Sequence, residues 1–221
     1  MSWARRPALS PVCLVALSGP THAEEVAIDL PTTIVSASKD MEAAAYVQEV
    51  FTNNVMRVYT NEDIKGVELS GAMKNVIALG VGISTGLGYG DNARAALITR
   101  GIAEIARLGV TMGCNVHTFA GLAGIGDLIV TATSMHSRNN RAGILIGKGE
   151  TPENAVKEVG MVVEGMNALP AALELAERYQ VEMPIVQTVN AIVNKGMGAA
   201  EAVKSLMERG LKNELPQGYE K

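Results

Sequence analysis

The segment LSGAMKNVIALGVGISTGLGYG, residues 69–90, contains one charged side chain, Lys74, among small and apolar residues. It continues a helical pattern that begins at Asp63, so the sequence predicts one long helix over residues 63–86. A helix with so little charge is typical of a protein interior, and the 23 glycines of the chain fit helices that pack closely. We therefore expect Lys74 to be partly buried.

Two interpretations of Lys74 follow from its surroundings. Its neighbours on the same helical face are Ser70, Gly71, Ile77 and Ala78. Burial lowers the pKa of an ammonium group, which suits a side chain that gives and takes a proton near neutral pH. A lysine in such a helix can instead extend its charged end to water on its flexible stem. Spacing alone leaves the functional and the structural interpretation equally open.

The pattern of predicted elements divides the chain into two parts. In residues 1–62, apolar runs at 13–18, 32–38 and 55–60 predict strands, and helical patterns lie between them at 23–30 and, after Asp40 as N-cap, at 41–53. This order is typical of the end of an α/β unit. Residues 63–221 lack strand signals and predict an all-helical domain. Its helical patterns cover residues 63–86, 91–109 (from a cap at Asp91 to Gly109), 118–134, 137–149, 151–159, 168–180, 185–196 and 199–211.

The stretch AGIGDLIVTATSMHSRNNR, residues 123–141, combines a glycine turn with polar side chains at a predicted helix start. Ser137, Arg138 and Asn139 offer hydroxyl, guanidinium and amide groups beside free helix N–H groups, a combination that suits a phosphate. The structural alternative makes Ser137 an ordinary N-cap and Arg138 a solvated charge. Asp127, after the glycine turn, is likewise either a helix cap or a functional carboxylate.

Composition argues against several other functions. The net charge of −4 and the aromatic content of 4% argue against nucleic-acid binding. The uncharged stretch 76–89 is too short and too rich in glycine to predict a membrane span. The apolar run at 12–17 is too short for the core of an export signal, although arginines precede it.

Potential metal ligands and cofactor loops give no clear signal. Cys13 and Cys114 fit no metal spacing, so we expect two buried thiols in a reduced, cytoplasmic protein. His22, His117 and His136 are too scattered to predict a metal site, and we expect structural or surface roles for them. The glycine-rich stretches GVGISTG and GIGDLI follow no predicted strand, so neither is a dinucleotide-binding fingerprint.

Four segments taken together point to one protein family more specifically than any single motif does. They are LSGPTHAEEVA at 17–27, VELSGAMKNVIALGVGISTGLGYGDNARAALITRG at 67–101, TFAGLAGIGDLIVTATSMHSRNNR at 118–141 and VVEG at 162–165. In this order they resemble the NAD(P)-dependent glycerol-3-phosphate dehydrogenases of the bacterial cytosolic type. The resemblance implies that residues 1–62 are the last strands of a Rossmann-like domain. It also implies a helical domain like that of 6-phosphogluconate dehydrogenases over 63–221, and a homodimer.

The resemblance also implies a reaction and its residues. The reaction interconverts dihydroxyacetone phosphate and sn-glycerol 3-phosphate with NAD or NADP, for glycerophospholipid synthesis. Lys74, in the motif GAMKN, is implied as the general acid/base, and Asp127 as a carboxylate that orients the substrate. The other implied substrate contacts are Gly19, Thr21, Ser137, Arg138 and Asn139, and the implied dinucleotide contacts are Ala23, Arg138, Val162 and Glu164.

One departure from the family pattern bears on activity. The family's glycine-rich phosphate loop and several strand–helix units have no counterpart in this sequence, and residues 1–12 resemble no family segment. We therefore expect an N-terminally truncated chain that by itself binds NAD(P)H poorly and turns over slowly or not at all. The alternative interpretation is a non-enzymatic helical module that acts in dimerisation or another protein interaction.

Overall fold

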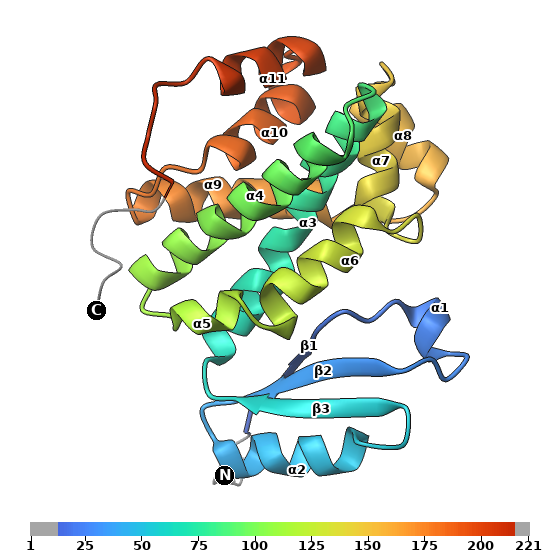
Figure 1. The fold of residues 1–221 in the computed structure, drawn as a ribbon, viewed down its shortest axis with the longest axis vertical. Coiled ribbons are helices and arrows are strands. Elements are labelled where there is room, and N and C mark those ends of the chain that lie inside the picture. The colour runs from blue at the N-terminus through green and yellow to red at the C-terminus, as the bar shows by residue number, and fades with distance from the viewer. Residues whose placement is uncertain (1–12, 215–221) are drawn as a thin grey trace, which may run out of the picture.

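The computed structural model describes residues 13–214, so the divergent head at 1–12 and most of the polar tail lie outside the described residues. Figure 1 shows two parts stacked on each other, a small sheet with the helices labelled α1 (Ala23–Val26) and α2 (Met41–Phe51) and a larger bundle of helices. The boundary falls between the third strand and the long helix that starts at Ile64. Both the α/β part and the helical part that the sequence predicts are therefore present.

Within residues 13–214, three strands form the sheet, in the order β1-β2-β3. Strand β2 (Thr32–Ala37) runs parallel to β3 (Met56–Asn61), whereas the short β1 (Ala16–Ser18) runs antiparallel to β2 with Ala16 opposite Ala37. The turn after β1 and the short helix α1 connect β1 to β2, whereas helix α2 lies in the crossover between the parallel strands β2 and β3. The predicted helix at 23–30 is correspondingly shorter, and Asp29 beyond it has a positive φ of 59°.

Helix α2 (Met41–Phe51) covers one face of β2 and β3, as Figure 1 shows below the sheet. It begins where predicted, because the Asp40 carboxylate accepts hydrogen bonds from the N–H groups of Glu42 and Ala43 at 3.0 and 3.1 Å. On the other side, the helical part meets the sheet through the region around residue 122 and through the long helix. The sheet is thus held between α2 and the helical part.

Helix α3 (Ile64–Gly86) runs through the middle of the helical part, as its charge-poor sequence predicts, and most of its residues are buried. Asp63 caps it by accepting a hydrogen bond from the N–H of Gly66 at 3.0 Å. The remaining elements surround it: α4 (Asp91–Thr111), α5 (Val116–Phe119), the π-helix η1 (Leu122–Gly126), α6 (Asp127–Thr133), α7 (Arg138–Gly147), α8 (Pro152–Val159), α9 (Glu164–Arg178), α10 (Pro184–Lys195) and α11 (Ala199–Met207).

Glycines set the distance between α3 and α7. A Cβ at Gly82 would overlap the carbonyl oxygen of Asn140, and one at Gly86 would overlap that of Ile144. In the other direction, a Cβ at Gly143 would overlap the carbonyl oxygen of Leu79. The two backbones therefore touch directly, without side chains between them. This is the close packing of helices that the glycine content predicts.

Three local predictions differ from the structure. Helix α4 does not end at Gly109 but continues to Thr111, because the side chain of Phe119 occupies the space in which Gly109 has no Cβ. Asp91 is the first residue of α4 rather than its cap, and Gly90 holds the N-cap position. Cys114 is buried as expected, but Cys13 is exposed, because it lies in the extended segment before β1 and donates its thiol hydrogen to Asp40.

The stretch Val116–Thr133 is long and apolar enough to cross a membrane by composition alone. In the structure this stretch is not one straight α-helix, since α5, η1 and α6 follow one another there. Almost half of it, 44%, is buried, and it includes the buried charged residue Asp127. It is therefore weak evidence for a span and fits a core segment of the helical part.

Glu104 is a buried carboxyl group that holds two helices together. It lies on α4 with 4% of its surface exposed and accepts hydrogen bonds from Ile185 N at 2.8 Å and Val186 N at 3.4 Å. These N–H groups belong to the first turn of α10, where no intrahelical partner exists. Met183, at the N-cap position of α10, makes no side-chain cap, so α4 supplies the acceptor instead. Burial raises the pKa of Glu104 to about 7, although its two backbone hydrogen bonds act against the rise.

The contact between α3 and α7 predicts that Gly143→Ala destabilises the fold. Helix propensity alone favours alanine by about 1 kcal/mol, but the added methyl group meets the backbone of α3, which yields only if the helices separate. We expect a net loss of about 1–3 kcal/mol in the free energy of unfolding, measured by urea denaturation. Gly90→Ala is the matched control, since a Cβ there meets nothing within 4 Å. Equal stability of both variants would contradict this account.

Glu104 predicts a pH-dependent stability. Its pKa rises from an ordinary 4.5 in the unfolded chain to about 7 in the fold. The folded state therefore binds the proton of Glu104 more tightly than the unfolded chain does. The contribution of this carboxyl group to the free energy of unfolding is complete below pH 4.5 and is lost as the pH rises through 7. The loss is on the order of 3 kcal/mol. We expect Glu104→Gln to flatten the unfolding free energy between pH 5 and 8 relative to the wild type; parallel profiles would show that Glu104 does not cause the dependence.

Candidate active site

Lys74 lies on α3 where the helix faces the sheet, and its side chain is 18% exposed. One turn before it, Gly71 lies next to strand β1, since a Cβ there would be in ordinary van der Waals contact with Ser18 Oγ, at 3.5 Å. The ammonium group points to Asp127, with Nζ 2.5 Å from Oδ2. The prediction of a partly buried lysine is confirmed. Its charged end is paired within the protein rather than extended alone into water.

Asp127 is the first residue of α6 and is only 4% exposed. Burial raises the pKa of its carboxyl group, and the charge and hydrogen bond of Lys74 oppose this rise, as does the hydrogen bond that Thr131 donates from Oγ1 at 3.3 Å. The interpretation of Asp127 as a simple helix cap is wrong, because its side chain accepts no cap hydrogen bond from α6. Its carboxylate instead forms an ion pair with Lys74.

The backbone before Asp127 explains this placement. The glycine turn expected at 124–126 is a π-helix that runs directly into α6. A Cβ at Gly124 would overlap the carbonyl group of Phe119, so a side chain there would prevent the wide π turn. Such wide turns are frequent at functional sites because they re-aim the residues that follow. Here the residue that follows is Asp127.

The helix start at α7 has the form that the sequence predicts. Ser137 is the N-cap, and its Oγ accepts a hydrogen bond from Asn140 N at 3.2 Å. The hydroxyl hydrogen of Ser137 and the N–H groups of Arg138 and Asn139, the first two residues of α7, have no partner within that helix. Arg138 is half-buried and makes no ion pair among residues 13–214. The structure thus confirms the capping role of Ser137 and leaves the Arg138 guanidinium available for an anion.

Asn139 has a role that the sequence did not reveal. Its side chain is buried and points into the helical part, where its Nδ2 donates to Asn75 Oδ1 at 3.0 Å. Its Oδ1 accepts a hydrogen bond from Gly165 N at 2.7 Å. Asn75 in turn donates to the carbonyl oxygen of Gly71 at 3.2 Å. The Asn139 side chain is therefore engaged within the protein, and a substrate could contact this residue through its backbone N–H near the start of α7.

Sequence reasoning missed Asn75 and Thr131. Asn75 follows Lys74 directly and connects α3 to α7, while Thr131 lies one turn after Asp127 and contacts its carboxylate. The spacing of Asp127 and Thr131, four residues on one helix, was a usable signal. The pairing of Asn75 with Asn139 joins residues far apart in the chain, so no local pattern contains it.

The turn after β1 brings Gly19 and Thr21 toward α6. Gly19 is buried with φ 151°, and a Cβ there would come within 3.0 Å of the Ile34 backbone. Thr21 Oγ1 donates back to the Gly19 carbonyl oxygen at 3.3 Å, which tightens the turn. Pro20 packs against Gly126, the residue before Asp127. The turn therefore lies beside the Lys74–Asp127 pair.

The residues proposed for the dinucleotide lie at the surface. Ala23 is exposed on α1, Val162 is 52% exposed, and Glu164 is exposed as the first residue of α9. The bond between Gly165 and Asn139 places the start of α9 next to the start of α7, where Arg138 lies. Within the described residues, no glycine-rich loop between a strand and a helix cradles a pyrophosphate. The dinucleotide contacts of Ala23, Val162 and Glu164 stay a prediction, and the structure leaves these residues accessible.

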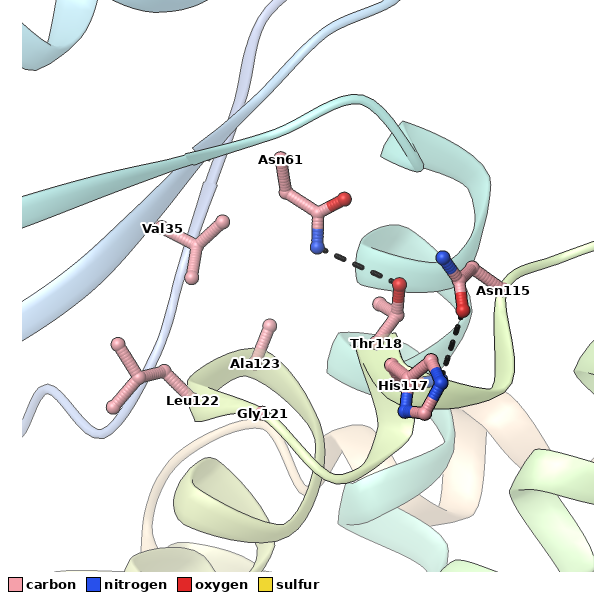
Figure 2. A pocket seen from close by; sticks show the side chains of 8 residues that line it. All are labelled: Val35, Asn61, Asn115, His117, Thr118, Gly121, Leu122 and Ala123. Carbon is pink, nitrogen blue, oxygen red and sulfur yellow. Dashed lines mark hydrogen bonds between the residues drawn. The ribbon is translucent and has the colours of Figure 1, made fainter.

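A separate cavity of about 150 Å³ lies where β2 and β3 meet α5 and η1 (Figure 2). Asn61 donates to Thr118 Oγ1 across it at 3.5 Å. None of the predicted site residues lines this cavity. In residues 13–214 no group of three His, Cys, Asp or Glu side chains is arranged to hold a metal.

Comparison with known proteins identifies the family. The model of the NAD-dependent glycerol-3-phosphate dehydrogenase C-terminus matches residues 63–204, and the model of the N-terminus of the same enzymes matches residues 6–44. A glycerol-3-phosphate dehydrogenase [NAD(P)+] of Lactobacillus delbrueckii subsp. bulgaricus is 68% identical over 201 residues, which are 91% of this chain and 60% of that protein. The Bacillus subtilis relative is 57% identical over 202 residues, 91% of this chain and 59% of the relative.

Solved structures agree with this assignment. Glycerol-3-phosphate dehydrogenase from Coxiella burnetii superposes with a TM-score of 0.87 at 40% identity, over 90% of this chain and 61% of that one. The yeast enzyme superposes with a TM-score of 0.77 at 28% identity, over 87% of this chain and 59% of that one. The chain thus spans about 60% of the length of these relatives. It belongs to the NAD-dependent glycerol-3-phosphate dehydrogenase family.

Proposed function

We propose that this chain provides the substrate-binding and proton-transferring part of a glycerol-3-phosphate dehydrogenase, which interconverts dihydroxyacetone phosphate and sn-glycerol 3-phosphate for glycerophospholipid synthesis. The observation that carries the proposal is the buried Lys74–Asp127 pair, 2.5 Å apart, beside a helix start with an unpaired arginine. Family membership favours this oxidoreductase function over a purely structural helical module.

Lys74 is the group that moves the proton. When the C2 carbonyl of dihydroxyacetone phosphate is reduced, its oxygen gains negative charge and needs a proton, which an ammonium group within hydrogen-bond reach can give. In the reverse direction the neutral amine removes the hydroxyl proton. Asp127 holds Nζ in place through their ion pair, while Thr131 holds the carboxylate. NADH or NADPH, when bound, supplies the hydride for C2.

Arg138 and the start of α7 hold the phosphate end of the substrate. Free N–H groups and the partial positive charge at a helix N-terminus favour an anion. The guanidinium adds charge-assisted hydrogen bonds to the same oxygens. The turn at Gly19 and Thr21 closes the site from the sheet side, where Pro20 packs against Gly126. The substrate therefore lies between the two parts of the chain, with C2 toward Lys74.

The cofactor, assembly and location of the protein follow from the same resemblance. NAD or NADP would contact Ala23, Val162 and Glu164, which are exposed. The names of the relatives give both nucleotides, as NAD(P)+. We further propose a homodimer in the cytoplasm. Sedimentation equilibrium at several protein concentrations tests the dimer, and a purely monomeric species would contradict it.

The role of Lys74 predicts a loss of turnover in Lys74→Ala. We would join this chain to the segment of the Bacillus subtilis relative that precedes the aligned region and follow NADH and NADPH oxidation with dihydroxyacetone phosphate. Loss of a general acid typically lowers kcat by roughly 100- to 10,000-fold. Lys157→Ala, at an exposed position on α8, serves as the control and should leave kcat unchanged. Unaltered turnover in Lys74→Ala would refute the acid/base role.

The role of Arg138 predicts weaker binding of the phosphate group. In the chain as it stands, Arg138→Ala should raise the Kd for sn-glycerol 3-phosphate by roughly tenfold to hundredfold, since a hydrogen bond to a charged group contributes about 1.5–3 kcal/mol. Isothermal titration calorimetry measures this, with Arg178→Ala, exposed on α9, as the matched control. Equal Kd values for the two variants would place the phosphate elsewhere.

A further inference from the structure

Two imidazole rings lie beside the proposed site and have no role in it so far. His22 follows Thr21 in the turn after β1, and its carbonyl oxygen accepts hydrogen bonds from Glu25 N and Val26 N, both at 3.1 Å. His136 precedes Ser137 in the turn between α6 and α7. The centroids of the two rings are 5.7 Å apart. Histidines that are distant in the sequence thus converge across the two parts of the chain.

The His22 ring contains a polar atom without a partner. Its Nε2 is shielded from solvent and forms no hydrogen bond with any described residue. Leaving such an atom unsatisfied costs about 1–3 kcal/mol, so folds rarely retain one without a reason. One other buried side-chain atom of residues 13–214 is in the same state, Ser70 Oγ, one turn before Lys74 on α3. Both unsatisfied atoms therefore belong to segments that border the Lys74–Asp127 pair.

The position of His22 relates it to the phosphate end of that site. Its turn packs on Gly126, next to Asp127. Burial raises the pKa of Asp127, and the charge of His22 is one of the weaker influences that oppose the rise, which places the ring within electrostatic range of the carboxylate. On its other side the ring meets His136, whose neighbour Ser137 caps α7. His22 thus belongs to the turn that packs beside Asp127, and its ring centroid lies 5.7 Å from that of His136, the residue before the N-cap of α7.

We propose that His22 is a further substrate-binding residue, whose Nε2–H donates a hydrogen bond to a phosphate oxygen of the bound three-carbon substrate. This inference rests on the proposed function. An imidazole nitrogen that carries a hydrogen can donate it to a phosphate oxygen, and even the neutral ring carries one such N–H. Substrate binding supplies the acceptor that Nε2 lacks among residues 13–214. The exposed His136 lies beside the ring, with the two ring planes tilted by 52°.

The test compares sn-glycerol 3-phosphate binding by the wild-type chain with that of His22→Ala, His22→Gln and His117→Ala, by isothermal titration calorimetry. We expect His22→Ala to raise the Kd roughly tenfold or more, as for the loss of a hydrogen bond to a charged group. Glutamine can place an N–H near the position of Nε2, so His22→Gln should recover most of the affinity. His117→Ala removes a histidine that lines the separate cavity and should not change the Kd.

A second readout separates substrate binding from a structural role. Removal of an unsatisfied buried atom should leave the melting temperature of the ligand-free His22→Ala protein unchanged or higher, whereas a structural histidine would lower it. NMR of the wild-type chain should show a shift of the His22 imidazole resonance on addition of sn-glycerol 3-phosphate and none with glycerol. If His22→Ala does not fold, this NMR shift alone decides the proposal.

The outcomes distinguish the two proposals. The role of His22 would be overturned, and the proposed function left intact, if Arg138→Ala bound sn-glycerol 3-phosphate more weakly while His22→Ala bound it with wild-type affinity. An imidazole resonance of His22 that does not move at saturating ligand would have the same meaning. No binding of sn-glycerol 3-phosphate by the wild-type chain would overturn both. A shift produced equally by inorganic phosphate would support a contact with the phosphate group, and a shift produced by glycerol would contradict it.

Discussion

The direct contact between the backbones of α3 and α7 is the constraint on which the rest of the structure depends. It exists because glycines face each other on both helices, with Gly82 against Asn140 and Gly143 against Leu79. Side chains at these positions would separate the helices and move the start of α7 away from Lys74. The proposed phosphate site and the proposed acid/base therefore share one geometric origin. Most residues of α3 are buried against the surrounding elements and carry no charge, while its charged residues Lys65 and Glu68 lie at exposed positions near its start.

Asp63 makes a second connection, between the sheet and the helical part. Its carboxylate caps α3 through Gly66 N and also accepts hydrogen bonds from Asn115 N and Thr118 Oγ1, both at 2.9 Å. The residue lies two positions after the end of β3, so the end of the sheet, the start of α3 and the start of α5 meet at one side chain. Because α5 leads through η1 to Asp127, this carboxylate sets the starting points of both segments that form the Lys74–Asp127 pair.

Local sequence signals predicted the elements well and the contacts between them poorly. The caps at Asp40 and Ser137 and the proline after Thr151 mark helix starts because their physics involves only neighbouring residues. The burial of Lys74 was predictable from the composition of its helix. The π-helix before Asp127 was not, since it depends on the fit of Gly124 against Phe119. Glu104 caps α10, and Asn75 forms a hydrogen bond with Asn139. Both contacts join segments that are distant in the chain, so no periodic pattern in the sequence predicts them.

The hydrogen bonds through Asn75 and Asn139 have a consequence for the energetics of substrate binding. All of their donors point the same way, from Gly165 through Asn139 and Asn75 to the carbonyl oxygen of Gly71, so neither amide can rotate without breaking its neighbour's bond. Such a series fixes α3, α7 and the start of α9 relative to one another before any ligand arrives. The conformational entropy of arranging these segments is thus lost during folding, and little of it remains to be lost when the substrate binds.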